Sequence, residues 1–495
     1  MLKRIRLTAA VVCFVLVTLL FLDFTGVTHK WWGWLAKAQF VPAVLALNAG
    51  VIALWVVLTL VFGRVYCSVI CPLGVFQDMV SRAGGKFRKN RFRYSPALTW
   101  LRGGVLVAFI VSGAFAGISL LFRLLEPYSA YGRMASGLLA PLYRWANNLL
   151  AFGAEQADSY MFYSVEVRMA GVLTLATAFA TLVILSLLAW RGGRTYCNTV
   201  CPVGTVLGAL ARFSWFKPVI DESACVNCRL CERNCKASCI DIAHHRIDYS
   251  RCVACMNCID RCAKGAIRYA HAPAGGQQSA AEPAATDEGR RKFLTIASLF
   301  AVGTWVRAQE KTVDGGLAVI EEKKVPERKT RLTPAGSRSA RNFASHCTAC
   351  QLCVSACPNG VLRPSASLEH LMQPEMSYES GYCRPECVRC SEVCPAGAIR
   401  PLTVAEKSSV QIGHAVYVPE NCVVNTDGVM CGNCARHCPS GAIQMVPSVP
   451  DAPDSPRLPV VNVERCIGCG ACENLCPARP FSAIYVEGHE NHRII

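Results

Sequence analysis

Six closely spaced groups of four cysteines constrain this chain more than any other feature. The 495 residues include 30 cysteines, and 24 of them fall into these groups. Zinc sites usually take their four ligands as two separated pairs, which fits runs of four and eight cysteines poorly. Disulfides are a weaker alternative for the C-terminal part, because the spacing is that of [4Fe–4S] ligands.

The first two groups lie in one segment. Cys225-x2-Cys228-x2-Cys231-x3-Cys235 and Cys252-x2-Cys255-x2-Cys258-x3-Cys262 have the spacing of bacterial two-cluster ferredoxins, in which the fourth cysteine crosses to the other cluster. We therefore assign the ligands as Cys225, Cys228, Cys231 and Cys262 for one cluster, and Cys252, Cys255, Cys258 and Cys235 for its neighbour. Lys236 and Ala263 stand where proline usually follows, and Cys239 is interpreted as a spare thiol that could substitute for a neighbour.

The C-terminal part holds four more groups, each ending in Cys-Pro. They are Cys347, Cys350, Cys353 and Cys357; Cys383, Cys387, Cys390 and Cys394; Cys422, Cys431, Cys434 and Cys438; and Cys466, Cys469, Cys472 and Cys476. With the first two groups they predict six [4Fe–4S] clusters, with these cysteines as the iron ligands.

Four further cysteines belong to an internal repeat. Gly-Arg-x-Tyr-Cys-x3-Cys-Pro occurs at 63–72 and again at 193–202, with Cys67 and Cys71 in the first copy and Cys197 and Cys201 in the second. Residues i and i+4 share a helix face, so each pair can converge on one partner. Metal binding, dithiol–disulfide cycling and a structural role all stay open. Cys13 is interpreted as a buried apolar residue.

Apolar segments predict a membrane unit. Residues 7–22, 40–62, 103–122 and 169–190 are apolar, and the last three are long enough to cross about 30 Å of hydrocarbon. A cleaved signal peptide is the alternative for the first, but a secreted soluble domain would not carry three more spans. We expect a multi-domain membrane protein: an α-helical four-span unit with α+β ferredoxin-like domains.

Basic residues predict the orientation. The loop after the second span contains Arg82, Lys86, Arg88, Lys89, Arg91 and Arg93. Arg191 and Arg194 follow the fourth span, so both ends of the unit are expected in the cytoplasm. From Arg341 onward, 11 Lys/Arg face 14 Asp/Glu, so the net charge of +17 comes from the preceding part. The basic residues flank apolar runs rather than form a stripe with aromatics, which argues against nucleic acid as a partner.

A second export signal precedes the C-terminal groups. Arg290-Arg291-Lys292-Phe293-Leu294 ahead of a modest apolar stretch resembles a twin-arginine signal, with a basic anchor for a peripheral helix as the alternative. The predicted domains are a membrane unit (1–215), a cytoplasmic two-cluster domain (216–270), a disordered linker (271–289), the twin-arginine-like segment (290–308), a linker (309–342) and a periplasmic four-cluster domain (343–495).

Other redox chemistry has little support in the sequence. The four spans contain no histidine, so a bis-histidine haem is not expected, and no haem-attachment, flavin or molybdopterin motif is found. Glu126 and His29 are weak candidates for groups that take a proton from quinol. A solvated carboxylate at a helix end is the simpler interpretation of Glu126.

These motifs resemble known families. The spans, the Cys-x3-Cys-Pro repeats and the two-cluster domain resemble the NapH family, and the later part resembles NapG, so the chain looks like a NapH–NapG-like fusion. The first half is also similar to the membrane parts of NosR and CcoG proteins. The four C-terminal groups resemble four-cluster subunits of molybdenum oxidoreductases, in which the first motif exchanges its last cysteine with the fourth, and the second with the third.

The resemblance implies a membrane-bound electron carrier in the bacterial inner membrane. It implies electron transfer from the quinone pool through the clusters to a periplasmic reductase, such as nitrate reductase, or to its cytochrome or molybdenum subunit. One alternative is electron supply for maturation of an exported copper or other redox enzyme. Another is a redox sensor or assembly scaffold.

Overall fold

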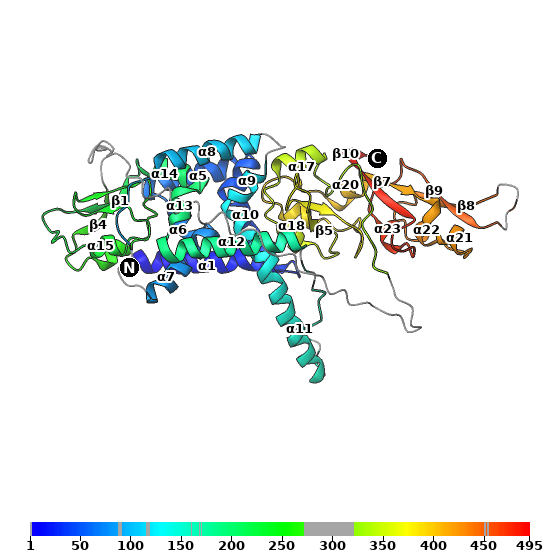
Figure 1. The fold of residues 1–495 in the computed structure, drawn as a ribbon, viewed down its shortest axis with the longest axis horizontal. Coiled ribbons are helices and arrows are strands. Elements are labelled where there is room, and N and C mark those ends of the chain that lie inside the picture. The colour runs from blue at the N-terminus through cyan, green and yellow to red at the C-terminus, as the bar shows by residue number, and fades with distance from the viewer. Residues whose placement is uncertain are drawn as a thin grey trace, which may run out of the picture.

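A computed structural model describes residues 2–87, 92–114, 119–159, 161–167, 169, 171–271, 321–449, 452 and 455–495. These residues form three parts in a line: a small domain, a helical unit and a larger C-terminal domain (Figure 1). The predicted twin-arginine-like segment at 290–308 lies outside the described residues, as do 272–289 and 309–320.

The helical unit combines long and short helices. They are α1 (Leu2–Leu22), α2 (Val27–Trp32), α3 (Trp34–Lys37), α4 (Phe40–Leu45), α5 (Ala49–Phe62), α6 (Val65–Val69), α7 (Pro72–Phe87), α8 (Thr99–Ala114), α9 (Ser119–Leu125), α10 (Pro127–Met134), η2 (Ala135–Leu139), α11 (Ala140–Gln156), α12 (Val172–Gly192), α13 (Thr195–Thr199) and α14 (Pro202–Ala211). Helices α1 and α12 are apolar and have 21 residues each, which indicates membrane association by length and composition alone.

Of the other two predicted spans, one is interrupted and one is described only in part. Segment 40–62 divides into α4 and α5, because Leu47 adopts a left-handed φ of 52° and Asn48 caps α5 by accepting a hydrogen bond from the Val51 amide. Segment 103–122 includes residues of α8 and α9, with 115–118 outside the described residues. Among the described residues, the structure thus shows two long apolar helices and one interrupted segment, and four continuous spans are not shown.

The small domain is built on two antiparallel strands. Strand β1 (Phe216–Ile220) pairs with β4 (Ile267–His271), and between them lie β2 (Ile240–Asp241), β3 (Arg246–Ile247), α15 (Leu230–Arg233) and α16 (Asn257–Arg261). Isoleucines and most of the cysteines of both N-terminal groups form its core. This is the α+β arrangement expected of a ferredoxin domain.

The C-terminal domain has short elements around two cores. Its elements are α17 (Ala340–His346), α18 (Leu352–Ala356), β5 (Leu362–Pro364), β6 (Pro374–Met376), α19 (Arg389–Val393), α20 (Val404–Ser409), β7 (Val410–Tyr417), η4 (Pro419–Asn421), α21 (Val423–Thr426), α22 (Asn433–Arg436), β8 (Ile443–Pro447), β9 (Arg457–Val461), α23 (Ala471–Leu475) and β10 (Ile484–Ile494). Cysteines of the first two C-terminal groups belong to a core that continues into the helical unit, whereas those of the last two belong to a separate core.

The two cysteine-rich domains contact opposite ends of the helical unit (Figure 1). On the side of the small domain, the Arg194 amide donates to the Lys236 carbonyl at 2.8 Å, and Tyr269 donates to the carbonyl of Phe62, the last residue of α5, at 2.8 Å.

On the other side, Arg123 donates to the Leu371 carbonyl at 3.1 Å, and Ser136 donates to the Gln351 side chain at 2.9 Å. The helical unit therefore separates the two domains.

Helix α1 shows how far apart these contacts are. Near its start, Lys3 pairs with Asp260 of the small domain at 2.5 Å. Near its end, Phe21 packs beside Gly132. The carbonyl oxygen of Cys350 in the C-terminal domain is so close to Gly132 that a Cβ added there would lie 2.4 Å from it. A 21-residue helix is about 30 Å long, so the contacts of α1 with the two domains are roughly this far apart.

Candidate iron–sulfur centres

Short loops with an unusual backbone hold the cysteines of four of the six runs. Asn227 and Arg229 follow the first two cysteines of their run with φ of 52° and 57°, and Ala254 and Met256 repeat this with 47° and 60°. Residues with side chains rarely adopt positive φ, and such conformations often mark ligand sites. The C-terminal runs at Ala349 and Gly468 use the same turn.

In the small domain, several of the cysteine thiols lie close together. Burial raises the pKa of Cys258, and the neighbouring thiols that raise it further are Cys255, Cys252 and Cys235. Cys231 lies close to Cys225 and Cys228 in the same way. The Cys239 Sγ lies 3.5 Å from the Cys235 Sγ, so this cysteine is next to the ligand group and is 2% exposed.

Electrostatic contacts among the buried thiols divide the C-terminal cysteines into four sets. The sets are Cys347, Cys350 and Cys353 with Cys394; Cys383, Cys387 and Cys390 with Cys357; Cys466, Cys469 and Cys472 with Cys438; and Cys431 and Cys434 with Cys476. Cys422 joins the last set, because it and Cys434 both lie beside Tyr417.

This grouping corrects the exchange expected from the resemblance. Cys476 does not join the first C-terminal motif, and Cys438 does not join the second. Consecutive motifs exchange their last cysteines instead, because α18 packs on α19 and α22 on α23 within separate cores.

The sets follow one another along the molecule. Cys357 and Cys394 cross between the first and second sets, and the Cys383 amide donates to the Cys469 carbonyl at 2.9 Å, which joins the second and third sets. The first set lies against the helical unit through Cys350. The last set is near the far end of the domain, where α21, α22, β8 and β9 lie (Figure 1).

The donor set fits iron–sulfur clusters better than single ions. Burial raises the pKa of Cys347 to about 12 and that of Cys231 to about 11, so these thiols need a metal to become thiolates at neutral pH. Among the described residues, no group of three or more His, Cys, Asp or Glu is spaced for one metal ion. A tetrahedral zinc site with Zn–S of about 2.3 Å keeps its sulfurs within about 4 Å of each other, whereas a cube holds its ligands farther apart.

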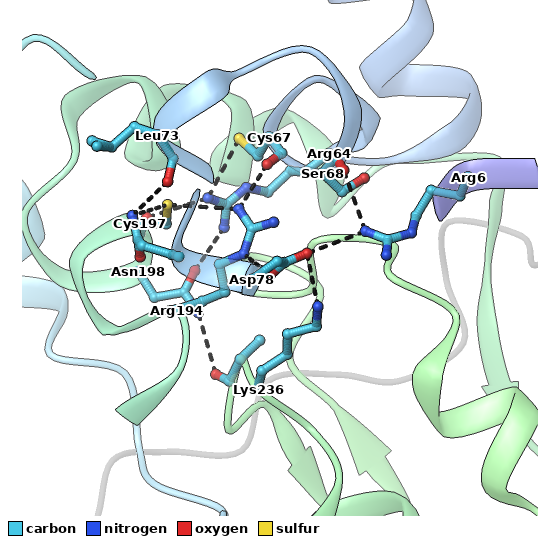
Figure 2. Close-up of polar contacts among 12 residues, drawn as sticks. Arg6, Arg64, Cys67, Ser68, Leu73, Asp78, Arg194, Cys197, Asn198 and Lys236 are labelled. Carbon is cyan, nitrogen blue, oxygen red and sulfur yellow. Dashed lines mark hydrogen bonds and ion pairs between the residues drawn. The ribbon is translucent and has the colours of Figure 1, made fainter. Parts of the chain in front are cut away.

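The two Cys-x3-Cys-Pro repeats come together at the end of the helical unit that faces the small domain. Cys67, Cys71, Cys197 and Cys201 are each 4% exposed and share one core. The arginine of each repeat also forms a hydrogen bond with the other repeat. Arg64 donates to the Cys197 carbonyl at 3.2 Å, and Arg194 donates to the Cys67 carbonyl at 2.7 Å (Figure 2).

A buried acid neutralises this basic site. Asp78 accepts from Arg194 at 2.7 Å, from Lys236 at 2.7 Å and from Arg6 at 3.2 Å (Figure 2). Burial alone would raise the pKa of Asp78, but Arg194 and Lys236 more than offset it and hold that pKa well below its usual range. The carboxylate thereby joins α1, α7, the second repeat and the small domain.

The structure places the two weak quinol candidates in buried positions. Glu126 is 1% exposed and caps α10 by accepting from the Tyr128 amide at 3.0 Å, so it is not a solvated carboxylate. Burial raises its pKa. His29 lies in α2, with its Nδ1 atom 3.4 Å from the Asp23 carboxylate, and no contact joins it to Glu126 among the described residues.

Several residues of these sites were not singled out from the sequence. Arg64 and Arg194 were visible as part of the repeated Gly-Arg-x-Tyr, but nothing showed that each would reach the other copy. Asp78 had no sequence signal. Its role depends on Lys236, which stands in the position where the ferredoxin pattern usually has proline.

Comparison with known proteins agrees with the cluster motifs. The 4Fe-4S binding domain family matches residues 45–91 and 172–220, and the 4Fe-4S dicluster domain family matches 346–398 and 427–479. Each dicluster match spans two consecutive motifs, in agreement with the grouping above. A methylamine utilization ferredoxin-type protein, MauM of Methylobacillus flagellatus, is 31% identical over 166 residues, which is 32% of this chain and 70% of MauM. The chain belongs to the ferredoxin-type 4Fe–4S proteins.

Other ferredoxin-type relatives match in part. NapG of Escherichia coli K12 is 29% identical over 201 residues, covering 38% of this chain and 81% of NapG. NapF of the same strain is 28% identical over 159 residues, covering 32% and 87%. An uncharacterized protein of Methanocaldococcus jannaschii is 60% identical over 40 residues, but the chain spans only 16% of its length. No solved structure matches. Together these results establish an iron–sulfur electron-transfer protein that holds multiple [4Fe–4S] clusters.

Proposed function

We propose that this ferredoxin-type protein is bound to the bacterial inner membrane and carries electrons from quinol to a periplasmic reductase. The observation that carries the proposal is the presence of successive cysteine groups on both sides of the helical unit. [4Fe–4S] clusters pass one electron at a time, so such a series suits stepwise transfer. The partial similarity to NapG, together with the NapH-like repeats, supports a reductase such as nitrate reductase as the acceptor.

The arrangement of the parts supports the proposed sidedness. The small domain contacts the helical unit beside Phe62 and Arg194, which follow apolar segments. The C-terminal domain contacts Arg123 and Ser136, on the opposite side. With the positive-inside rule, this supports a cytoplasmic small domain and a periplasmic C-terminal domain.

A cleft beside Cys357, a member of the second C-terminal set, suits quinol. Its volume is about 1620 Å³, and its lining includes Val172 and Leu175 of α12, Cys357 and His370. The His370 Nδ1 is buried, with no hydrogen-bond partner among the described residues. Burial lowers the pKa of His370 to about 4, so its neutral ring can accept a hydrogen bond from a quinol hydroxyl.

The chemistry of quinol fits this place. Oxidation releases two electrons and two protons, and the electrons leave one at a time through the nearby cysteine groups. Glu369 and Glu375 also line the cleft and can take protons toward water. The cleft is therefore a better quinol site than Glu126 or His29.

A reduction assay tests the proposed function. The holoprotein in liposomes should show bleaching of its cluster absorbance when a quinol analogue is added without air. His370→Phe should slow this reduction, while dithionite still reduces the same clusters. If no quinol reduces the clusters even with the periplasmic partner present, the proposal is wrong.

A further inference from the structure

The four cysteines of the two repeats have surroundings that the six ligand groups do not explain. Neither repeat alone supplies more than two thiols, and each match to the 4Fe-4S binding domain family contains only one Cys-x3-Cys pair. All four thiols are buried in one core. The neighbouring thiols that raise the pKa of Cys201, after burial, are Cys197, Cys67 and Cys71, so the two pairs face each other.

Positively charged side chains surround these thiols. The Arg64 Nη2 lies 3.8 Å from the Cys67 Sγ, the Arg194 Nη1 lies 3.8 Å from the Cys197 Sγ, and Gln77 donates toward the Cys197 Sγ at 3.4 Å. Both arginines are 0% exposed. The Arg194 Nη2 is buried and has no hydrogen-bond partner among the described residues. A buried donor of this kind indicates an anionic acceptor.

Two glycines make room for this arrangement. A Cβ on Gly74 would lie 2.3 Å from the Cys67 carbonyl oxygen and 2.6 Å from the Arg194 Nη1. Gly204, at the same place in the second repeat, would bring a Cβ to 2.1 Å from the Cys197 carbonyl oxygen and 2.9 Å from the Arg64 Nη2. The site is therefore built symmetrically from both repeats.

We propose that Cys67, Cys71, Cys197 and Cys201 jointly bind one further [4Fe–4S] cluster, with Arg64 and Arg194 balancing its negative charge. Four cysteine ligands are the complete set for such a cluster. This inference deepens the proposed function, since the cluster would take one electron from a cluster in one domain and give one toward the other.

The position of the site fits this role. Toward the small domain, Arg64 donates to the Ser250 carbonyl at 3.1 Å, two residues before the ligand Cys252. Toward the C-terminal domain, Tyr196 donates to the Leu125 carbonyl at 2.8 Å, next to Glu126, which lies within electrostatic reach of Cys350. The site thus divides the gap of about 30 Å along α1.

Iron analysis of anaerobically purified full-length protein tests the inference. We expect about 28 iron atoms per chain, four for each of seven clusters, whereas about 24 would contradict a seventh. Cys67→Ala and Cys197→Ala should each lose the same four irons, and the double variant should lose no more, because both repeats serve one site. Cys13→Ala, in α1, is the control and should lose none.

Two further measurements guard against misfolding and separate this inference from the proposed function. Arg64→Gln should keep the iron but lower the reduction potential of one cluster, because removing a positive charge disfavours the added electron; unchanged potentials would contradict the charge-balancing role. Iron content does not depend on quinol. If the protein holds about 28 irons but quinol does not reduce its clusters, only the proposed function is contradicted. If it holds about 24 irons and quinol does reduce its clusters, only the seventh cluster is contradicted.

Discussion

Lys236 of the small domain forms an ion pair of 2.7 Å with Asp78 of the helical unit. Lys236 follows directly after the ligand Cys235, where ferredoxins usually have proline. The departure from the pattern thus has a structural reason: the side chain attaches the small domain to the helical unit beside the paired repeats.

Replacing Lys236 should weaken this attachment. In Lys236→Met, Asp78 keeps Arg194 and Arg6 but loses one charged partner, so we expect a loss of about 2 kcal/mol in stability. Hydrogen exchange should rise at the contact between the domains while iron content stays constant. Lys3→Met is the matched control: it breaks the exposed pair with Asp260 between the same two parts and should change little. Equal effects of both variants would contradict the role of Lys236.

Double variants test the cysteine grouping of the C-terminal domain. Cys347→Ala and Cys394→Ala should remove the same electron paramagnetic resonance signal, and combining them should remove no second one, because both cysteines belong to one set. Combining Cys347→Ala with Cys476→Ala should remove two signals. If instead the pair Cys347→Ala and Cys476→Ala removes one signal and the pair Cys347→Ala and Cys394→Ala removes two, the first motif exchanges its last cysteine with the fourth.

His370 gives a prediction about pH. Its pKa is lowered to about 4 from an ordinary value near 6.5, by burial first and then by Arg331. As the pH falls below about 6.5, the unfolded chain takes up the proton first, so stability is lost between about 6.5 and 4. The thermal midpoint of the wild-type protein should therefore fall more between pH 7 and pH 5 than that of His370→Asn. His244→Asn, which changes an exposed histidine of the small domain, should keep the wild-type slope.

Sidedness can be tested with inserted protease sites. Lys264 in the small domain and Met430 in the C-terminal domain are exposed, and Met430 is 90% exposed. In intact spheroplasts, a site inserted next to Met430 should be cut and one next to Lys264 should not. Cleavage at both or at neither would contradict the proposed arrangement across the membrane.

The sequence predicted local chemistry better than long-range pairing. Spacing identified the ligand runs, because three cysteines in one short loop approach each other whatever the rest of the fold does. It did not show which run would supply Cys394 or Cys476, since this depends on which short helices pack together. The division of segment 40–62 was missed because the capping side chain of Asn48 and the left-handed Leu47 interrupt an otherwise apolar stretch.

Local sequence patterns also could not predict that the two Cys-x3-Cys-Pro repeats come together. Each Cys-x3-Cys-Pro pair could be read as a separate site, because 125 residues lie between Cys71 and Cys197. Arg64 and Arg194 join the pairs through contacts with the opposite copy, and only the fold shows them. The predicted role of Glu126 changed as well, because its helix end is covered rather than solvated.

One-sided reduction tests the central claim, that the cysteine sites form a connected path through the helical unit. The protein should be placed in vesicles with the C-terminal domain outward, and a reductant that cannot cross the membrane added outside. We predict that the clusters held by Cys225 and Cys252 in the small domain become reduced in the wild type and stay oxidised in Cys67→Ala/Cys197→Ala. Failure of the wild type to transfer electrons to the small domain would contradict the connected path.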